Sequence, residues 1–340
     1  MQITIHQVAE KAGVSVSTAS RILNGGTKGL RRDALKRAEL VLKTAEGLGY
    51  RPNAVARGLV MKRTWTVGFI GTEINNPVRS RLIETLRHLA QQNGLQLLVS
   101  GTGHGENIGE TLNAMTARRV DGLILAGIDR DRQTGLQSLI DSGFPLVEFG
   151  HSDANTGNRI FIDYFELTRQ LTRHLAENHG LKDIVFAGLS GDYPRCNGYR
   201  QGMRECGLEQ HIHFWKNEAT TLSHGREITR QRLAVGDRPQ AIIAHNDLTA
   251  IGVMAELRDH GLRVPEDVAV IGHDNIEMAS YTNPTLTSAG VNSEWLSQTL
   301  FDRLLELIES PGAGKFQQLR CEGEIFHRES CGCINRHKNH

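Results

Sequence analysis

Residues 3–24 read ITIHQVAEKAGVSVSTASRILN, a spacing typical of two short helices joined by a glycine turn. Thr4 and Gln7 form a capping box at the start of the first helix, where each side chain satisfies a backbone N–H group of the other residue. Apolar residues then recur on one helical face, at Ile5, Val8, Ala9 and Ala12. Gly13 can adopt the left-handed conformation that ends this helix. The stretch therefore predicts a compact helical hairpin.

The second helix of the hairpin is predicted to begin at Ser15, whose hydroxyl can cap it. A second helix held at this angle fits the major groove of DNA. We expect Arg21 to grip guanine O6 and N7 with two hydrogen bonds, and Thr18 and Asn24 to contact phosphates. The candidate DNA contacts are Thr4, Ser15, Val16, Ser17, Thr18, Ser20, Arg21 and Asn24. The alternative is an ordinary helical hairpin whose Ser and Thr side chains face water.

A third amphipathic helix is predicted from Leu30 to Leu48, with an apolar stripe of Leu35, Ala38, Leu42 and Ala45. Pro52 then suits the first turn of a short helix over Asn53–Leu59. That helix is marginal alone because it is short and because Gly58 costs about 1 kcal/mol relative to Ala. We expect it to order only when DNA and a partner chain hold it.

The composition bounds the class of protein. A length of 340 residues predicts two or three domains, and no apolar run is long enough to span a bilayer. The first residues lack the apolar core of a signal peptide, which predicts a cytoplasmic protein. Residues 1–63 carry twelve Lys/Arg and four Asp/Glu, whereas the remainder carries 27 and 34. This asymmetry indicates a basic arm for a polyanion on an acidic body, although a basic surface without a ligand is the alternative.

These N-terminal motifs resemble those of the lactose-repressor/galactose-repressor (LacI/GalR type) family of transcriptional regulators. The resemblance rests on VAEKAGVSVSTASRILN at residues 8–24 and LGYRPNAVARGL at residues 48–59. It implies that Val16, Ser17 and Arg21 read bases in the major groove.

The resemblance further implies that the hinge helices of two subunits lie side by side in the minor groove. Such a homodimer matches the two-fold symmetry of a palindromic operator. Leu59 would wedge between base pairs and kink the duplex, with Asn53 and Ala56 as further hinge contacts. Two departures from the family pattern occur. Ala19 replaces the usual Val, and Gly25–Leu30 is a few residues longer than the usual loop.

After Thr64, apolar runs alternate with helical patterns, which predicts an α/β architecture of parallel sheets buried on both faces. The predicted strands are 65–70, 95–99, 122–126, 146–149, 160–162, 183–187, 241–244 and 268–271. The predicted helices are 79–93, 108–118, 165–179, 198–206 and 248–260. Two such series predict two similar lobes. Because ligands bind at the carboxyl ends of strands in open α/β sheets, we expect the effector in the cleft between the lobes.

The resemblance covers residues 3–330 and implies a periplasmic-binding-protein-like core with three crossovers between its lobes. The predicted organisation is a helix-turn-helix domain at 1–50, a hinge helix and linker at 51–63, a core at 64–330 and a tail at 331–340. Within the core, the N-lobe is expected at about 64–162 plus 293–324, and the C-lobe at about 163–292 plus 325–330.

Candidate effector contacts lie at the ends of the predicted strands. The resemblance implies that Arg195 holds hydroxyls or a carboxylate of the effector, and that Asp274 grips the ligand. An Arg and an Asp that face each other across a cleft can clamp a polyol with charge-assisted hydrogen bonds. Asn246 and His273 are further candidates at neighbouring strand ends. For each of these residues, the alternative is a salt bridge, a cap or plain polar surface.

Arg79 lies in the first strand-to-helix loop, where it would favour an acidic effector such as a sugar acid or a phosphate. An Arg that points to solvent from the start of a helix is the more common arrangement. An aromatic residue is common near Val78 in the family and is absent here, which argues against sugar stacking from that side.

The sequence shows no catalytic constellation and predicts no cofactor. Residues 188–192 read GLSGD, which lacks the final Gly of a nucleophile elbow. The five cysteines are odd in number and scattered, which argues against a disulfide framework. Cys331 and Cys333 lie near His327, but their spacing is not that of a zinc knuckle, so we expect no metal and a frayed tail.

The sequence therefore predicts an allosteric repressor of a carbohydrate catabolic operon. It would bind operator DNA as a homodimer and a sugar, sugar acid or related metabolite in its cleft. The alternative is a periplasmic-type sugar-binding protein without enzymatic activity.

Overall fold

The computed structural model describes residues 3–23, 32–50, 63–103, 107–128, 135–150, 157–216, 218–310 and 316–333. It consists of two compact units. One comprises Met1–Thr66 with Met115–Asp121, and the other comprises Val67–Ala114 with Gly122–His340. Among the described residues, no helix is both long and apolar enough to cross a membrane.

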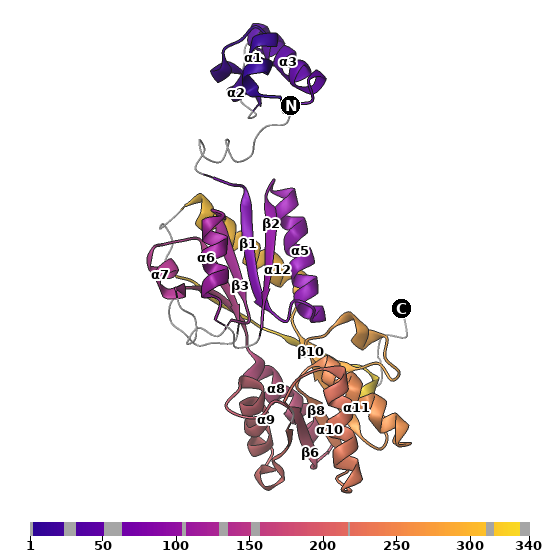
Figure 1. Ribbon diagram of the computed structural model, residues 1–340. Helices are drawn as coiled ribbons and strands as arrows, with labels where there is room; N and C mark the ends of the chain where they lie inside the picture. The colour runs from indigo at the N-terminus through magenta and orange to yellow at the C-terminus, as the bar shows by residue number, and fades with distance from the viewer. Residues whose placement is uncertain are drawn as a thin grey trace. The chain divides into compact units, whose positions relative to one another are not determined.

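The N-terminal part of the first unit packs three helices together (Figure 1): α1 (Ile5–Lys11), α2 (Val16–Leu23) and α3 (Arg32–Gly47). Both predicted helix starts are confirmed. The Thr4 N–H donates to Gln7 Oε1 at 2.9 Å, and the Thr18 N–H donates to Ser15 Oγ at 3.2 Å. The small core consists of Val8, Ala9, Ala12, Ala19, Ile22, Ala38, Val41 and Ala45.

The predicted apolar stripe of α3 is wrong at two positions. Leu35 and Leu42 are 43% and 46% exposed, whereas Val41 is fully buried with Ala38 and Ala45. Residues 38, 41 and 45 also share one helical face, so the sequence offered two overlapping stripes. Packing against α1 and α2 uses the stripe with the smaller side chains, which allows a closer approach of the helices.

The second unit contains two α/β lobes, each built on a six-stranded sheet. The first sheet has the order β11-β5-β4-β3-β1-β2. Its strands are β1 (Thr66–Thr72), β2 (Gln96–Thr102), β3 (Gly122–Ala126), β4 (Leu146–Gly150), β5 (Asn158–Ile162) and β11 (Gln318–Cys321). Its helices are α5 (Pro77–Gln92), α6 (Gly109–Ala117), α7 (Leu136–Asp141) and α12 (Ser293–Glu309). Helix α5 packs against α12 and β2, and α12 covers β3 and β4.

The second sheet has the order β12-β10-β9-β8-β6-β7. Its strands are β6 (Ile184–Gly188), β7 (His213–Lys216), β8 (Ala241–Ala244), β9 (Ala269–His273), β10 (Thr287–Gly290) and β12 (Glu324–Phe326). Its α-helices are α8 (Tyr164–Arg173), α9 (Pro194–Glu205), α10 (Leu222–Ala234) and α11 (Asp247–Asp259). A π-helix, η2 (His174–Asn178), continues α8, and short 3-10 turns are η3 (Glu209–His211), η4 (Glu277–Ser280) and η5 (Glu329–Cys331).

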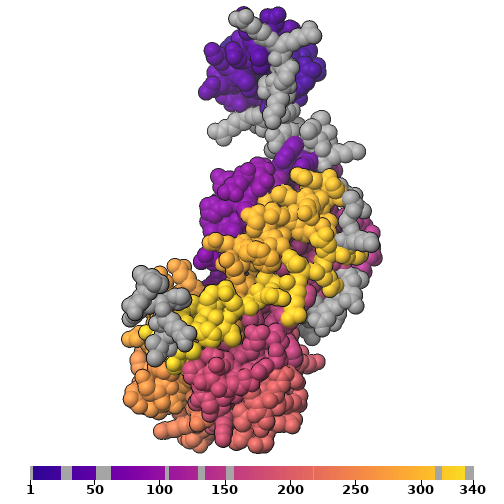
Figure 2. Space-filling view, turned by 180° about the vertical axis from the view of Figure 1, so that it is seen from behind, coloured from indigo at the N-terminus to yellow at the C-terminus, as the bar shows by residue number. Residues whose placement is uncertain are grey.

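The chain passes between the two lobes three times, after β5, after β10 and after β11. The last pass belongs to the yellow segment in Figure 2, which runs along the surface from the first lobe to the second. The sheets are parallel as predicted, except that β12 pairs antiparallel with β10. β11 ends at Cys321 in the first lobe, and β12 begins at Glu324 in the second.

Candidate functional site

The candidate DNA-contact residues on α2 divide by exposure. Ser17 and Arg21 are exposed, whereas Ala19 is buried in the helical core. Val16 is only partly available, because it also packs against that core. The Ser15 hydroxyl caps α2 and lies within hydrogen-bond distance of the Ser17 and Thr18 hydroxyls, at 2.9 and 2.8 Å. The exposed face of α2 is thus polar, with one cation.

Of the other predicted DNA contacts, Thr4 lies within the described residues and several do not. Thr4 is exposed, and its hydroxyl donates to Gln7 Oε1 at 3.3 Å. Several features predicted from the sequence lie outside the described residues: Asn24, the loop Gly25–Leu30, and the hinge contacts Asn53, Ala56 and Leu59.

The second unit brings Arg195 and Asp274 together. Arg195 lies in the first turn of α9, and Asp274 directly follows β9. Arg195 Nη2 donates to Asp274 Oδ1 at 2.9 Å, and both side chains are 11% exposed. The Tyr164 hydroxyl, at the start of α8, donates to the same oxygen at 3.2 Å. The Arg195 guanidinium also lies 3.5 Å from the centre of the Tyr164 ring, in a cation–π contact.

Tyr164 was not predicted from the sequence. Burial, followed by the charge of Asp274, raises the pKa of Tyr164 above its usual value, so the phenol remains a hydrogen-bond donor. Its position is fixed by the Asp163 side chain, which accepts from the Glu166 N–H and caps α8. The only sequence signal was that Tyr164 begins the helix after the first crossover.

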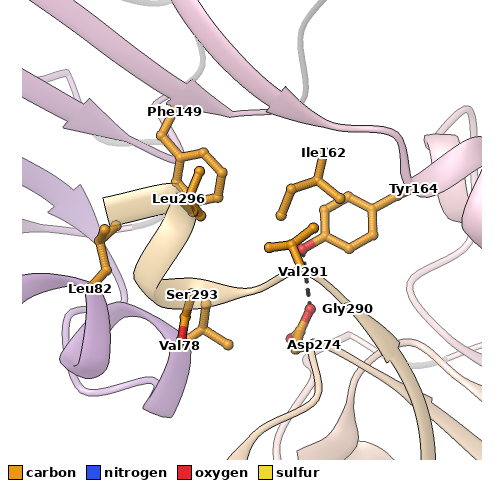
Figure 3. Close-up of a pocket in the computed structure, with 10 residues that line it drawn as sticks. All are labelled: Val78, Leu82, Phe149, Ile162, Tyr164, Asp274, Gly290, Val291, Ser293 and Leu296. Carbon is orange, nitrogen blue, oxygen red and sulfur yellow. Dashed lines mark hydrogen bonds between the residues drawn. The ribbon is translucent and has the colours of Figure 1, made fainter. Parts of the chain in front are cut away.

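These polar groups border a pocket between the lobes (Figure 3). The enclosed cavity is small, at about 20 Å³, and the wider space of about 390 Å³ around it includes open solvent. Its lining is Val78, Leu82, Phe149, Ile162, Tyr164, Asp274, Gly290, Val291, Ser293 and Leu296. The first lobe contributes mainly apolar side chains, and the second lobe contributes Tyr164 and Asp274. A ligand here would meet a dry wall on one side and charged groups on the other.

Arg79 faces the interior rather than solvent, contrary to the more common arrangement. Its guanidinium lies 5.0 Å from the centre of the Phe149 ring. It also packs against Gly127, where a Cβ atom would come within 2.7 Å of Arg79 Nη2. Burial lowers the pKa of Arg79, and the nearby charge of Asp274 opposes that shift. Arg79 therefore adds a second cation on the side of the first lobe.

Two further predicted effector contacts make hydrogen bonds within the second lobe. Asn246 caps α11, where its Oδ1 accepts from the Thr249 N–H at 2.9 Å and its Nδ2 donates to the Thr220 carbonyl at 3.0 Å. His273 is fully buried, with Nδ1 2.9 Å from the Ala244 carbonyl and Nε2 2.8 Å from the Thr168 hydroxyl. Neither side chain is among the residues that line the pocket.

The backbone that carries Asp274 is strained. Asp274 and Asn275 have φ angles of 95° and 49°, in a region that non-glycine residues rarely adopt. Asp247 holds this loop, because its carboxylate accepts from the Ile276 N–H at 2.8 Å and the Ser288 hydroxyl at 2.6 Å. Burial, followed by the charge of Asp274, holds the pKa of Asp247 well above its usual range. Strain of this kind concentrates at ligand clamps and active sites.

Comparisons with known proteins identify the class. Residues 4–53 match the family described as bacterial regulatory proteins, lacI family, and residues 172–331 match a periplasmic binding protein-like domain. The chain is 31% identical over 295 residues to catabolite control protein A of Priestia megaterium, covering 85% of this chain and 87% of that protein. It is 32% identical over 322 residues to the HTH-type transcriptional repressor PurR of Vibrio campbellii, covering 90% and 92%.

Solved structures of transcription regulators are also similar to this chain. The lac repressor dimer bound to operator and the anti-inducer ONPF has a TM-score of 0.85 at 25% identity, covering 97% of this chain and 99% of that one. The transcriptional regulator CelR in complex with cellobiose has a TM-score of 0.68 at 27% identity, covering 97% and 100%. These findings confirm the resemblance seen in the sequence.

The chain therefore belongs to the lacI family of bacterial regulatory proteins. It is a ligand-responsive, DNA-binding transcriptional regulator, and its relatives are transcription regulators as well.

Proposed function

We propose that this protein is a repressor whose effector binds between the lobes, held by Arg195, Asp274 and Arg79. One observation carries the proposal. Arg195 Nε is buried and has no hydrogen-bond partner among the described residues, although the same guanidinium pairs with Asp274. A buried donor without a partner costs about 1–3 kcal/mol, and a ligand oxygen at this place would remove that cost.

The chemistry of the pocket selects a class of effector. Asp274 supplies one carboxylate to the lining, and Phe149 and Leu82 supply an apolar wall. Two cations lie behind these lining residues, because Arg195 pairs with Asp274 and Arg79 lies over the Phe149 ring. A ligand ring with hydroxyls on one edge and a carboxylate or phosphate on the other could bind all of these groups. The hydroxyls would donate to Asp274, the anion would pair with the arginines, and the ring would pack on the apolar wall. Among the similar regulators, CelR is described in complex with cellobiose. A sugar acid or a sugar phosphate is the class that this pocket favours.

The helical unit would bind the operator DNA. Ser17 and Arg21 are exposed on α2, where they are able to read base edges in the major groove. A homodimer on a palindromic operator would place two such helices one DNA turn apart. The lac repressor is described as a dimer bound to operator. Because operator DNA lies in the cytoplasm, we place the protein there, and we assign it no enzymatic step.

A contact for the dimer is offered by η4 in the second lobe. Met278 and Tyr281 at this turn are 48% and 79% exposed. Large apolar side chains that are exposed to this degree are candidates for an interaction surface. We propose that η4 contributes to the interface between two chains.

The effector site is tested by thermal shift of the full chain against sugars, sugar acids, sugar phosphates and nucleobases. A ligand at 100 times its Kd stabilises the folded protein by about 2.7 kcal/mol. Arg195→Met should abolish the shift. Arg204→Met is the matched control, because Arg204 lies on the same helix and pairs with Glu209 at the surface. A ligand shift that survives Arg195→Met unchanged would reject this site.

A further inference from the structure

A second cluster of reactive side chains lies away from the effector pocket. It joins the end of α8 to the C-terminal segment, and its members are His174, His179, Cys331 and Cys333. Their four candidate ligand atoms all lie within 4.8 Å of one another. Cys331 is buried and the other three are half-buried. Neither the family match nor the predicted function uses these residues.

The distances within the cluster resemble the edges of a coordination tetrahedron. Cys333 Sγ lies 3.4 Å from His174 Nε2 and 3.5 Å from His179 Nε2. Cys331 Sγ lies 3.8 Å from His174 Nε2, and the two histidine Nε2 atoms are 3.1 Å apart. With Zn–S of about 2.3 Å and Zn–N of about 2.0–2.1 Å, a tetrahedral zinc gives S···N edges of about 3.5 Å and N···N edges of about 3.3 Å.

We propose that His174, His179, Cys331 and Cys333 form a structural zinc site. Two thiolates and two imidazoles are a donor set that selects zinc, and four protein ligands leave no open position for chemistry. Metal binding would release the two thiol protons and neutralise the charge of the ion with two thiolates. The site would fasten the C-terminal segment to the second lobe.

Ordinary hydrogen bonds do not account for the same contacts. A thiol donates one hydrogen bond and its sulfur is only a weak acceptor, yet Cys333 Sγ lies within 3.6 Å of nitrogens on three imidazoles, those of His174, His179 and His327. His174 Nε2 likewise faces His179 Nε2 and both sulfur atoms. The available protons serve only some of these contacts. A cation at the centre would serve all of the ligand atoms together.

Local structure brings the ligands to one point. In a regular α-helix, residues five apart point about 140° away from each other. The π-helix η2, which starts at His174, uses i→i+5 hydrogen bonds, and this wider turn brings His179 round to the side of His174. Gly332 has a φ of 87° between the two cysteines, and this left-handed residue turns both sulfur atoms toward the histidines. A π-turn within a helix is often associated with a functional site.

This proposal departs from the expectation of no metal and a frayed tail. The sequence analysis considered only zinc motifs whose ligands lie close together in the sequence. The two histidines of this cluster lie about 150 residues before Cys331 and Cys333. The segment is also packed as far as it is described, because Ser330 and Cys331 are buried. Residues 334–340 of the predicted tail lie outside the described residues.

The test is metal analysis of the full chain. Protein purified from zinc-supplemented medium and washed with a weak chelator should retain about one zinc per chain by mass spectrometry. Replacement by Co²⁺ should give visible bands of a tetrahedral ion with thiolate charge transfer. Cys333→Ser and His174→Ala should each lose the metal. Cys206→Ser is the matched control, since this cysteine lies outside the cluster, and it should keep the full content.

Two outcomes would overturn the proposal. Washed wild-type protein that holds no zinc and gives no thiolate band with Co²⁺ would do so without reference to any variant. Equal zinc content in wild type and in folded Cys333→Ser protein would show that only adventitious metal is bound. His327→Ala tests the ligand set, because we expect it to keep the zinc. Loss of zinc in His327→Ala, together with retention in Cys331→Ser, would refute the proposed fourth ligand.

Discussion

Because Arg195 and Asp274 form an ion pair, we expect Asp274→Asn to destabilise the wild-type protein but to stabilise the Arg195→Met variant. In Arg195→Met, the Asp274 carboxylate stays buried with the Tyr164 hydroxyl as its remaining side-chain donor. Breaking a buried pair in this way costs about 3–5 kcal/mol. Asp274→Asn alone should cost about 1 kcal/mol, because Asn tolerates the φ of 95° and still accepts from Arg195. In the Arg195→Met background, however, Asp274→Asn removes an unpaired charge and should recover about 2 kcal/mol.

Thermal unfolding of the four proteins without ligand measures this cycle. For a unit of this size, 1 kcal/mol corresponds to about 2 °C, so Arg195→Met should lower the Tm by about 6–10 °C. Adding Asp274→Asn should then raise it by about 4 °C. The control Arg204→Met breaks an ion pair whose side chains are 51% and 69% exposed. It should change the unfolding free energy by less than about 1 kcal/mol. If Asp274→Asn lowers the Tm equally in both backgrounds, the buried pair is not formed and the reasoning fails.

Four other substitutions test the remaining assignments. Arg21→Ala should cost about 1–3 kcal/mol of discrimination between operator and scrambled duplex in a mobility-shift assay, and unchanged discrimination would remove Arg21 from the readout. Burial lowers the pKa of His273 from the usual 6.5 to about 3, so its contribution to stability is present above pH 6.5 and is lost as the pH falls toward 3. His273→Gln should therefore reduce the loss of unfolding free energy between pH 6.5 and pH 3, by on the order of 5 kcal/mol in total. An unaltered dependence of the Tm on pH would contradict the buried neutral ring. Asn246→Ala should lower the free energy of unfolding by about 1–2 kcal/mol through loss of the helix cap and should leave the affinity for the effector unchanged. Loss of the effector response would show instead that Asn246 contacts the effector. Tyr281→Asp should shift the oligomer toward monomer in light scattering, and an intact dimer would exclude η4 from the interface.

The parts predictable from the sequence are those with a local physical cause. The Thr4 and Ser15 caps depend on hydroxyls close in sequence to the N–H groups that they serve, so spacing alone was sufficient. Buried parallel strands such as β3 and β8 are apolar throughout, which makes them visible as continuous runs. The strands that were missed lack this signal. In β11, three of four residues are exposed, and β12 has only three residues.

The parts not predictable depend on contacts between distant segments. Tyr164 and Asp274 are 110 positions apart, and nothing near either residue indicates that they share a hydrogen bond. Asn246 and His273 were placed correctly at strand ends, but a strand end does not reveal whether a polar side chain faces the pocket or the interior. The direction of each side chain depends on its hydrogen-bond partners, which lie elsewhere in the chain or on its backbone. The Asn246 side chain accepts from a backbone N–H, and the His273 ring lies against the Ala244 carbonyl.

The C-terminal segment links the two sites of the second lobe. Arg328 Nη2 donates to Asn275 Oδ1 at 2.7 Å, and its Nη1 donates to the Leu286 carbonyl at 2.6 Å. Asn275 is the second of the two strained residues after β9, and strain of this kind costs about 1–3 kcal/mol for each residue. Such a conformation persists only where its surroundings hold it. Arg328 is one of those supports, and the proposed zinc site begins three residues beyond it, at Cys331. The position of the Asp274 carboxylate in the proposed effector pocket is therefore supported by a segment that Glu329 and Ser330 already bind to the second lobe. The proposed zinc would hold the same segment at a further point.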